Sequence, residues 1–243
     1  MENMTEKIKE IIELLKKSDI QGCITGSSML DEDFDEWDSH PDVDVFCYGT
    51  NQHIHAIDYC MMKLGFEPGK YDETLDAAES WKVQRIMKGK CKRNMPVSTV
   101  SLCKDGVVIN LSCKPNQRSV CDVISAFDMS IVMIGYDIPT GYLMDLRGED
   151  VRTAVPNPLR PIEYDLVDTG YWVRQFDRVV KYYNRGFDTR PMASFYLDLI
   201  DRTTAEAPTF SSEKGKEFHD SFIDEFAGIR EKIEQWHLEH KED

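Results

Sequence analysis

The chain has 243 residues, of which 41% are hydrophobic and 30% charged, so it has the composition of a globular protein and the length for one large or two small domains. Its formal net charge of −15 disfavours long nucleic acid as a partner, because an acidic surface repels phosphate backbones. No apolar run approaches the roughly 20 residues of a membrane span, and the seven cysteines include no C-x-x-C pair, so we expect a soluble, cytoplasmic protein with reduced thiols.

Helical and strand patterns alternate in the first half of the sequence. The apolar periodicity predicts helices over about 3–17, 50–64 and 73–88, and a short helix after Ser119. Thr50 is the expected cap of the second helix, and Gly65 its end. Alternating apolar residues predict strands at 23–25, 43–48, 97–103, 107–113 and 129–136. The Lys-Asp-Gly turn between the third and fourth of these strands predicts a hairpin.

The second half of the sequence has a different pattern. From about residue 160 the alternation disappears, and the periodicity is helical to the end. The segment TAVPNPLRP, with three prolines in nine residues, is the best candidate boundary. We therefore predict an α+β protein, with a mixed-sheet core over 1–155 followed by an α-helical subdomain over 156–243.

Two aspartates interrupt the apolar strand at 43–48. Because side chains alternate along a strand, Asp42 and Asp44 point to one face, and the valines between them point to the other. Two neighbouring carboxylates repel each other unless a cation lies between them. Their hard oxygen ligands suit Mg²⁺ or Mn²⁺, and metals held in this way commonly support phosphoryl transfer. The loop before them, at 31–38, carries six carboxylates, which we interpret as a solvated insertion or as the lip of a metal site.

A small turn follows the preceding strand. Gly26 allows the backbone to approach a phosphate closely, and the hydroxyls of Ser27 and Ser28 can donate hydrogen bonds to it. Neither this turn nor the D-x-D pair is specific alone.

In this order the two motifs resemble the nucleotidyltransferase-fold superfamily, which includes DNA polymerase β, CCA-adding enzymes, and minimal and antibiotic nucleotidyltransferases. The matching residues are Ile24-Thr25-Gly26-Ser27, a spacer over 28–41, and Asp42-Val43-Asp44-Val45. The resemblance covers roughly residues 1–135. The runs INLSC and AFDMSIVMIGYD are similar to uncharacterised nucleotidyltransferase-like proteins of phages and bacteria.

The resemblance implies an activity. Asp42 and Asp44 would hold Mg²⁺ with a nucleoside triphosphate (NTP), and the turn at Gly26 would contact its terminal phosphates. A hydroxyl on a small molecule, an RNA end or a protein would then attack the α-phosphate. The family normally adds a third carboxylate on a later strand, but here the matching residue is Asn110, which has no charge and cannot act as a base.

Four further residues are candidates for the same site. Asp128 could replace the missing carboxylate, or it could be an ordinary turn residue. Arg178 and Lys181, on a basic helix, and Arg85 are expected phosphate contacts, although each basic patch could equally be a solvated face. A different class of function is a catalytically inactive member that binds a nucleotide or a partner protein, and Asn110 favours it.

Overall fold

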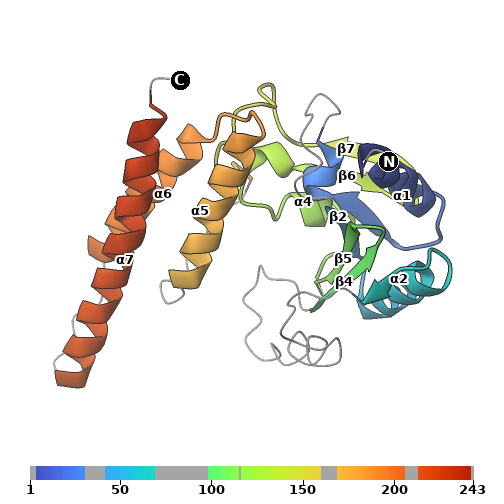
Figure 1. Ribbon diagram of the computed structural model, residues 1–243, viewed down its shortest axis with the longest axis horizontal. Coiled ribbons are helices and arrows are strands. Elements are labelled where there is room, and N and C mark those ends of the chain that lie inside the picture. The colour runs from blue at the N-terminus through green and yellow to red at the C-terminus, as the bar shows by residue number, and fades with distance from the viewer. Residues whose placement is uncertain are drawn as a thin grey trace. The chain divides into compact units, whose positions relative to one another are not determined.

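The computed structural model describes residues 4–30, 42–68, 98–114, 116–159, 169–205 and 213–241. Within them the chain divides into two compact units (Figure 1). The first unit comprises residues up to Phe127 together with Val132–Gly148, and the second comprises Asp128–Ile131 together with the chain from Glu149 onward. The division after Gly148 lies slightly upstream of the boundary expected at 155.

The first unit is built on a mixed sheet of seven described strands in the order β3-β4-β5-β2-β1-β6-β7. Neighbouring strands are antiparallel except β2 and β5, which are parallel. The strands are β1 Gly22–Thr25, β2 Asp42–Cys47, β3 Glu67–Pro68, β4 Ser98–Lys104, β5 Val107–Cys113, β6 Ile134–Asp137 and β7 Tyr142–Asp145.

One face of this sheet is the core of the first unit. Helices α1 (Met4–Lys16) and α2 (Thr50–Met62) pack on it, and their apolar residues join one cluster with Val43, Val45 and Ile109. The three strand residues are fully buried. Both helices lie to the right of the sheet in Figure 1. On the opposite face the short helix α4 (Val120–Ile124) packs against Cys23 and Phe46. The rest of that face therefore carries the polar side chains.

The local predictions that fall within the described residues of the first unit are confirmed with two exceptions. The β4–β5 hairpin turns through Asp105 and Gly106, whose φ angles of 51° and 87° are those of a tight two-residue turn. Ser119 caps α4, because its hydroxyl accepts a hydrogen bond from the Asp122 amide at 3.2 Å. Thr50 is not the cap of α2. Gly49 holds that position, so Thr50 is the first helical residue.

The second exception is the strand expected over 129–136. The structure has a 3₁₀ turn, η3 (Ser130–Val132), and β6 begins only at Ile134. The backbone amide of Ser130 donates to Val155 O at 2.9 Å, so this segment bonds to the second unit rather than to the sheet. The hairpin partner β7 was not expected from the sequence. The helix predicted over 73–88 lies outside the described residues.

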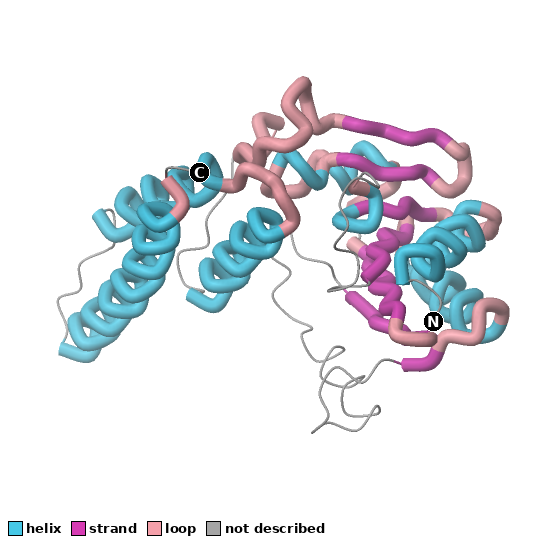
Figure 2. Tube along the Cα trace, turned by 45° about the horizontal axis from the view of Figure 1, so that its top comes forward, coloured by secondary structure: helices cyan, strands magenta, loops and turns pink. Residues whose placement is uncertain are grey.

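The second unit is helical, as predicted. Figure 2 shows its three main helices, α5 (Thr169–Asn184), α6 (Arg190–Ala205) and α7 (Glu213–Glu239). Trp172 from α5 is 1% exposed and meets the rings of Tyr196 and Phe226 edge to face, at centroid distances of 6.1 and 5.9 Å. The α+β class with a C-terminal helical region is therefore confirmed. None of the helices in the described ranges is long and apolar enough to cross a membrane.

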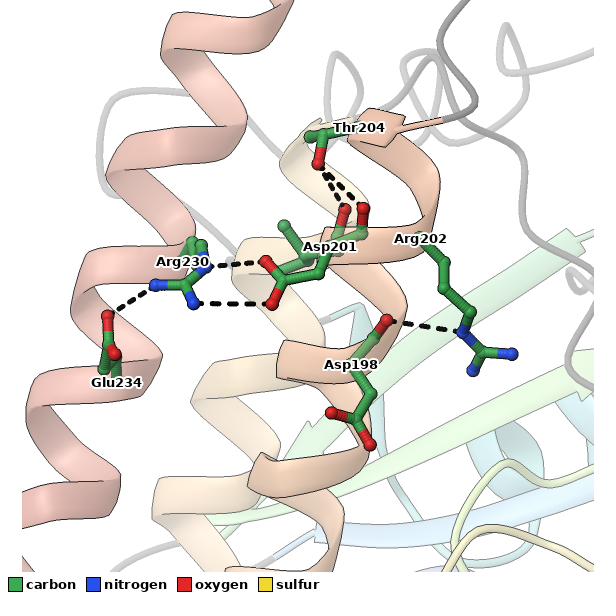
Figure 3. A network of polar contacts seen from close by, with 7 residues as sticks. Asp198, Asp201, Arg202, Thr204, Arg230 and Glu234 are labelled. Atoms are coloured by element: carbon green, nitrogen blue, oxygen red, sulfur yellow. Dashed lines mark hydrogen bonds and ion pairs between the residues drawn. The ribbon is translucent and has the colours of Figure 1, made fainter.

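A polar network on the surface joins α6 to α7 (Figure 3). Arg230 Nε and Nη2 donate to the two carboxylate oxygens of Asp201 at 2.6 and 3.4 Å, and Arg230 Nη1 donates to Glu234 at 2.5 Å. The side chains of Arg230 and Asp201 are 37% and 52% exposed, so solvent screens this contact. The network bridges the two helices at the surface and does not form part of their apolar core.

Candidate functional site

A row of polar residues crosses the face of the sheet opposite α1 and α2. Asp44 on β2 lies opposite Thr25 on β1 and opposite Asn110 on β5, and Asn110 in turn lies opposite Ser101 on β4. Residues that oppose one another in a ladder share a face. Side chains from strands far apart in the sequence are therefore brought together around Asp44.

The alternation expected in β2 is confirmed. Val43 and Val45 are fully buried in the core, whereas Asp42 and Asp44 are half-buried on the opposite face. One oxygen of Asp42, Oδ1, is buried and has no hydrogen-bond partner in the part of the chain that is described. An anionic oxygen that has lost its water without gaining a donor is costly, and a bound cation would remove that cost.

Asn110 lies beside Asp44, because the two residues oppose each other in the parallel pairing of β2 with β5. Its amide nitrogen donates to Asp44 Oδ1 at 3.1 Å, and its amide oxygen accepts from the Ser101 hydroxyl at 2.7 Å. The orientation of the amide follows from this network, because the opposite orientation would set its oxygen against a carboxylate. The face therefore presents a hydrogen-bond donor to Asp44 where a third anion was expected.

The turn after β1 packs directly on Asp44. Gly26 begins the 3₁₀ turn η1 (Gly26–Met29) with a φ angle of 78°, which favours glycine. A Cβ atom at this position would lie 2.5 Å from Asp44 Oδ2. The glycine is therefore required both by its backbone conformation and by the space that the carboxylate occupies.

The two serines of the turn differ. Ser28 is buried, and its hydroxyl donates to Thr25 O at 3.1 Å, so it closes the turn and cannot also face a ligand with that proton. Ser27 is half-buried, and its hydroxyl makes no hydrogen bond to another described residue. Of the two, Ser27 is the better candidate for a phosphate contact.

Two of the predicted site residues bind each other in the second unit. Arg178 Nη1 donates to both oxygens of Asp128 at 2.7 Å and to Gln175 Oε1 at 3.1 Å. Burial lowers the pKa of Arg178, but the attraction of Asp128, the electrostatic contributions of Tyr182 and Tyr196 and the hydrogen bond to Asp128 together outweigh it, and the net shift is upward. The roles predicted for Asp128 as a metal ligand and for Arg178 as a phosphate contact remain predictions, and each would have to compete with this ion pair.

The remaining predicted contacts add little. Lys181 follows Arg178 on α5, and its Nζ lies 5.9 Å from the centre of the Tyr182 ring. Arg85 and the acidic segment 31–38 lie outside the described residues. No group of three His, Cys, Asp or Glu side chains suited to a metal occurs among the residues that the structure describes. Asp42 and Asp44 could supply two carboxylate ligands to a cation.

Ser101 and Thr25 were missed in the sequence. Both join the row of Asp44, and the Thr25 hydroxyl ties β1 to β6 through a bond to Ile134 O at 2.6 Å. The register of the β4–β5 hairpin, counted from its two-residue turn, would have paired Ser101 with Asn110. No comparable local signal places Thr25 opposite Asp44.

Comparison with protein-family models, curated proteins and solved structures finds no match to this chain. A functional inference therefore has to begin from the geometry of this face.

Proposed function

We propose that the chain binds a nucleoside triphosphate with Mg²⁺ or Mn²⁺ at Asp42 and Asp44, and transfers its nucleoside monophosphate to an acceptor hydroxyl. The observation that carries this proposal is the packing of the Gly26 turn on Asp44, beside a second carboxylate with an unpartnered buried oxygen. A cation that joined the two carboxylates would also reach a triphosphate seated on the turn. The same turn and the same two aspartates are the residues on which the resemblance to nucleotidyltransferases rests.

Each residue of the candidate site has a distinct role in the proposed reaction. Asp42 and Asp44 hold the cation, which supplies charge to the phosphate oxygens. Ser27 and the backbone amides of the turn donate hydrogen bonds to the terminal phosphates. The acceptor oxygen bonds to the α-phosphorus, the bond between the α- and β-phosphates breaks, and pyrophosphate leaves. The hydroxyl proton goes to water or to a carboxylate of the pair, because Asn110 cannot accept it.

A second candidate function is nucleotide binding without transfer. It is favoured by one observation, the hydrogen bond from the Asn110 amide to Asp44, since this bond replaces the expected third carboxylate with a neutral donor. In that case the bound nucleotide would control contact with a partner protein.

The experiment that tests the proposal compares three proteins. Wild type, the double variant Asp42→Asn/Asp44→Asn and the control Asp58→Asn are incubated with each α-labelled NTP and Mg²⁺ or Mn²⁺, with and without cell extract. Asp58 is exposed on α2, away from Asp42 and Asp44. The control variant therefore makes the same chemical change at a position outside the candidate site. Binding of the same nucleotides is measured in parallel by calorimetry.

Label transfer by wild type and by Asp58→Asn, but not by the double variant, would support transfer. Metal-dependent binding that the double variant loses, without label transfer by any protein, would support the second candidate. Equal binding by the double variant and wild type would overturn both.

A further inference from the structure

The hydrogen bonds of Asn110 bear on how many cations this face can hold. Two-metal transfer sites place their cations about 3.5–4 Å apart, and anionic oxygens shared between protein and substrate offset their charge. The polar row offers two carboxylates, Asp42 and Asp44, and a neutral amide. The two carboxylates can ligate one divalent cation, whereas a second would find only the neutral amide of Asn110 and the phosphates of the nucleotide as further ligands in this row.

The geometry around Asp44 limits the second position further. Asp44 Oδ1 accepts from the Asn110 amide nitrogen at 3.1 Å, so one oxygen of the carboxylate already has a donor in the direction of β5. Asp44 Oδ2 lies on the opposite side, where it meets the backbone of Gly26. The unpartnered oxygen of Asp42 is on the neighbouring row of the same face. A cation that binds the oxygen of Asp44 facing Gly26 would therefore lie away from Asn110.

Ser101 stabilises this arrangement. Its hydroxyl donates to the Asn110 amide oxygen at 2.7 Å, and the residue is 6% exposed. To present its oxygen to a second cation, the amide would have to turn over and lose both hydrogen bonds in their present form. The gain would be one neutral carbonyl ligand, which binds Mg²⁺ less strongly than a carboxylate does.

We infer that the face holds a single divalent cation with its nucleotide, and that the hydrogen-bonded pair Asn110–Ser101 occupies the place of a second. This inference rests on the proposed metal–nucleotide site. It also bears on the choice between the two candidate functions, because a site with one cation lacks the metal that would activate an acceptor hydroxyl and so favours nucleotide binding without transfer.

The test counts cations without measuring activity. Mn²⁺ bound per chain is determined by electron paramagnetic resonance in the presence of a saturating NTP analogue that cannot be cleaved between the α- and β-phosphates. Wild type is expected to bind one Mn²⁺ in the ternary complex. Asn110→Asp, which replaces the donor with a carboxylate, is expected to bind two, with the spectral broadening of a coupled pair.

Two further variants serve as controls. Asn51→Asp makes the same chemical change at an exposed position of α2, so it adds the charge without adding a ligand, and one Mn²⁺ is expected. Ser101→Ala removes the hydroxyl but no charge, and one Mn²⁺ is again expected.

The possible failures can be distinguished. Two Mn²⁺ bound by wild type would overturn the inference and leave the proposed function intact. No Mn²⁺ bound by wild type would overturn the proposed function itself. One Mn²⁺ bound by a folded Asn110→Asp variant would show that Asn110 is not what excludes the second ion. If that variant does not fold, as judged by circular dichroism, the count for wild type decides.

Discussion

At the scale of single residues, Asp44 is the residue that joins the polar row of the sheet to the turn at Gly26. Its carboxylate is held between the amide of Asn110 and the backbone of Gly26, so its direction is fixed by neighbours on both sides. Asp42 has no such support, since its buried Oδ1 has no partner among the described residues. A cation site benefits from a ligand whose orientation is fixed, as at Asp44, and from an oxygen that lacks a hydrogen-bond partner, as at Asp42.

Gly26→Ala should displace Asp44, because the added methyl group would lie 2.5 Å from Oδ2. The matched control is Gly148→Ala. Gly148 has a φ angle of 87°, close to the 78° of Gly26, but no atom lies within 4 Å of its added Cβ. Both variants should lose about 1–2 kcal/mol of stability to backbone strain. Only Gly26→Ala should weaken Mn²⁺ binding, by tenfold or more in calorimetry. Equal Mn²⁺ affinities for the two variants would show that the turn does not orient Asp44.

His53 predicts a pH dependence of stability. It is 5% exposed on α2, and its Nε2 lies 2.9 Å from Leu111 O, so this nitrogen carries the proton and donates. Burial lowers the pKa of His53, and the hydrogen bond to Leu111 only partly opposes that shift. Below about pH 6.5 the unfolded chain therefore binds a proton that the folded chain does not, and the free energy of unfolding falls as the pH falls.

The slope from this one group is at most about 1.4 kcal/mol per pH unit. His53→Gln keeps a donor for Leu111 O but does not titrate, so urea denaturation between about pH 5 and pH 8 should give a flatter profile for the variant. Parallel profiles for wild type and variant would contradict this assignment.

The candidate site was only partly predictable at this scale. The alternation of Asp42 and Asp44 follows from the two-residue period of a strand, which depends on local sequence alone. That Asn110 faces Asp44 required the parallel pairing of β2 with β5, which the resemblance supplied and no local pattern does. The ion pair of Asp128 with Arg178 joins residues far apart in the sequence, so no local pattern predicts that the two side chains are partners.

At the scale of elements, a helix, strand or turn was predicted correctly when its sequence signal lies within the element itself. The β4–β5 hairpin was predicted because Asp105 and Gly106 tolerate the positive φ angles that the turn requires. The segment at 130–132 was predicted as strand from its apolar residues, but its bonds to Thr153 and Val155 lie in a different unit. β7 was missed because it is an exposed edge strand, whose residues show no buried alternation.

The pairing of α6 with α7 through Arg230 should contribute little to stability. The contact between Arg230 and Asp201 is bidentate, yet both side chains are more than a third exposed. A double-mutant cycle with Arg230→Gln and Asp201→Asn should give a coupling free energy below about 1 kcal/mol. The coupling should decrease further in about 1 M salt, because the Debye length falls to about 3 Å. A coupling of several kcal/mol that salt does not change would mean that the pair is desolvated.

At the scale of the whole molecule, each of the two units has an apolar cluster of its own. The first is centred on the sheet with α1 and α2, and the second on Trp172, Tyr196 and Phe226. The short segment Asp128–Ile131 interrupts the first unit in sequence but belongs to the second. The ion pair of Asp128 with Arg178 therefore lies within the second unit. Asp128→Asn should lower the unfolding temperature of that unit alone, which identifies its transition in scanning calorimetry.

Calorimetry with Mn²⁺ and a non-cleavable NTP analogue then tests which unit binds the nucleotide. A ligand that binds only the first unit should raise the temperature of only the transition that Asp128→Asn leaves unchanged. The first unit should gain about 2.7 kcal/mol of stability when the free ligand is at 100 times its dissociation constant. We expect this outcome, because the proposed metal ligands lie on β2 and Arg178 already has a carboxylate partner. If both transitions rise, and Lys181→Gln reduces the rise of the second, the phosphate contacts predicted on α5 take part in binding. A single transition for the whole chain would instead show that the two cores do not unfold independently.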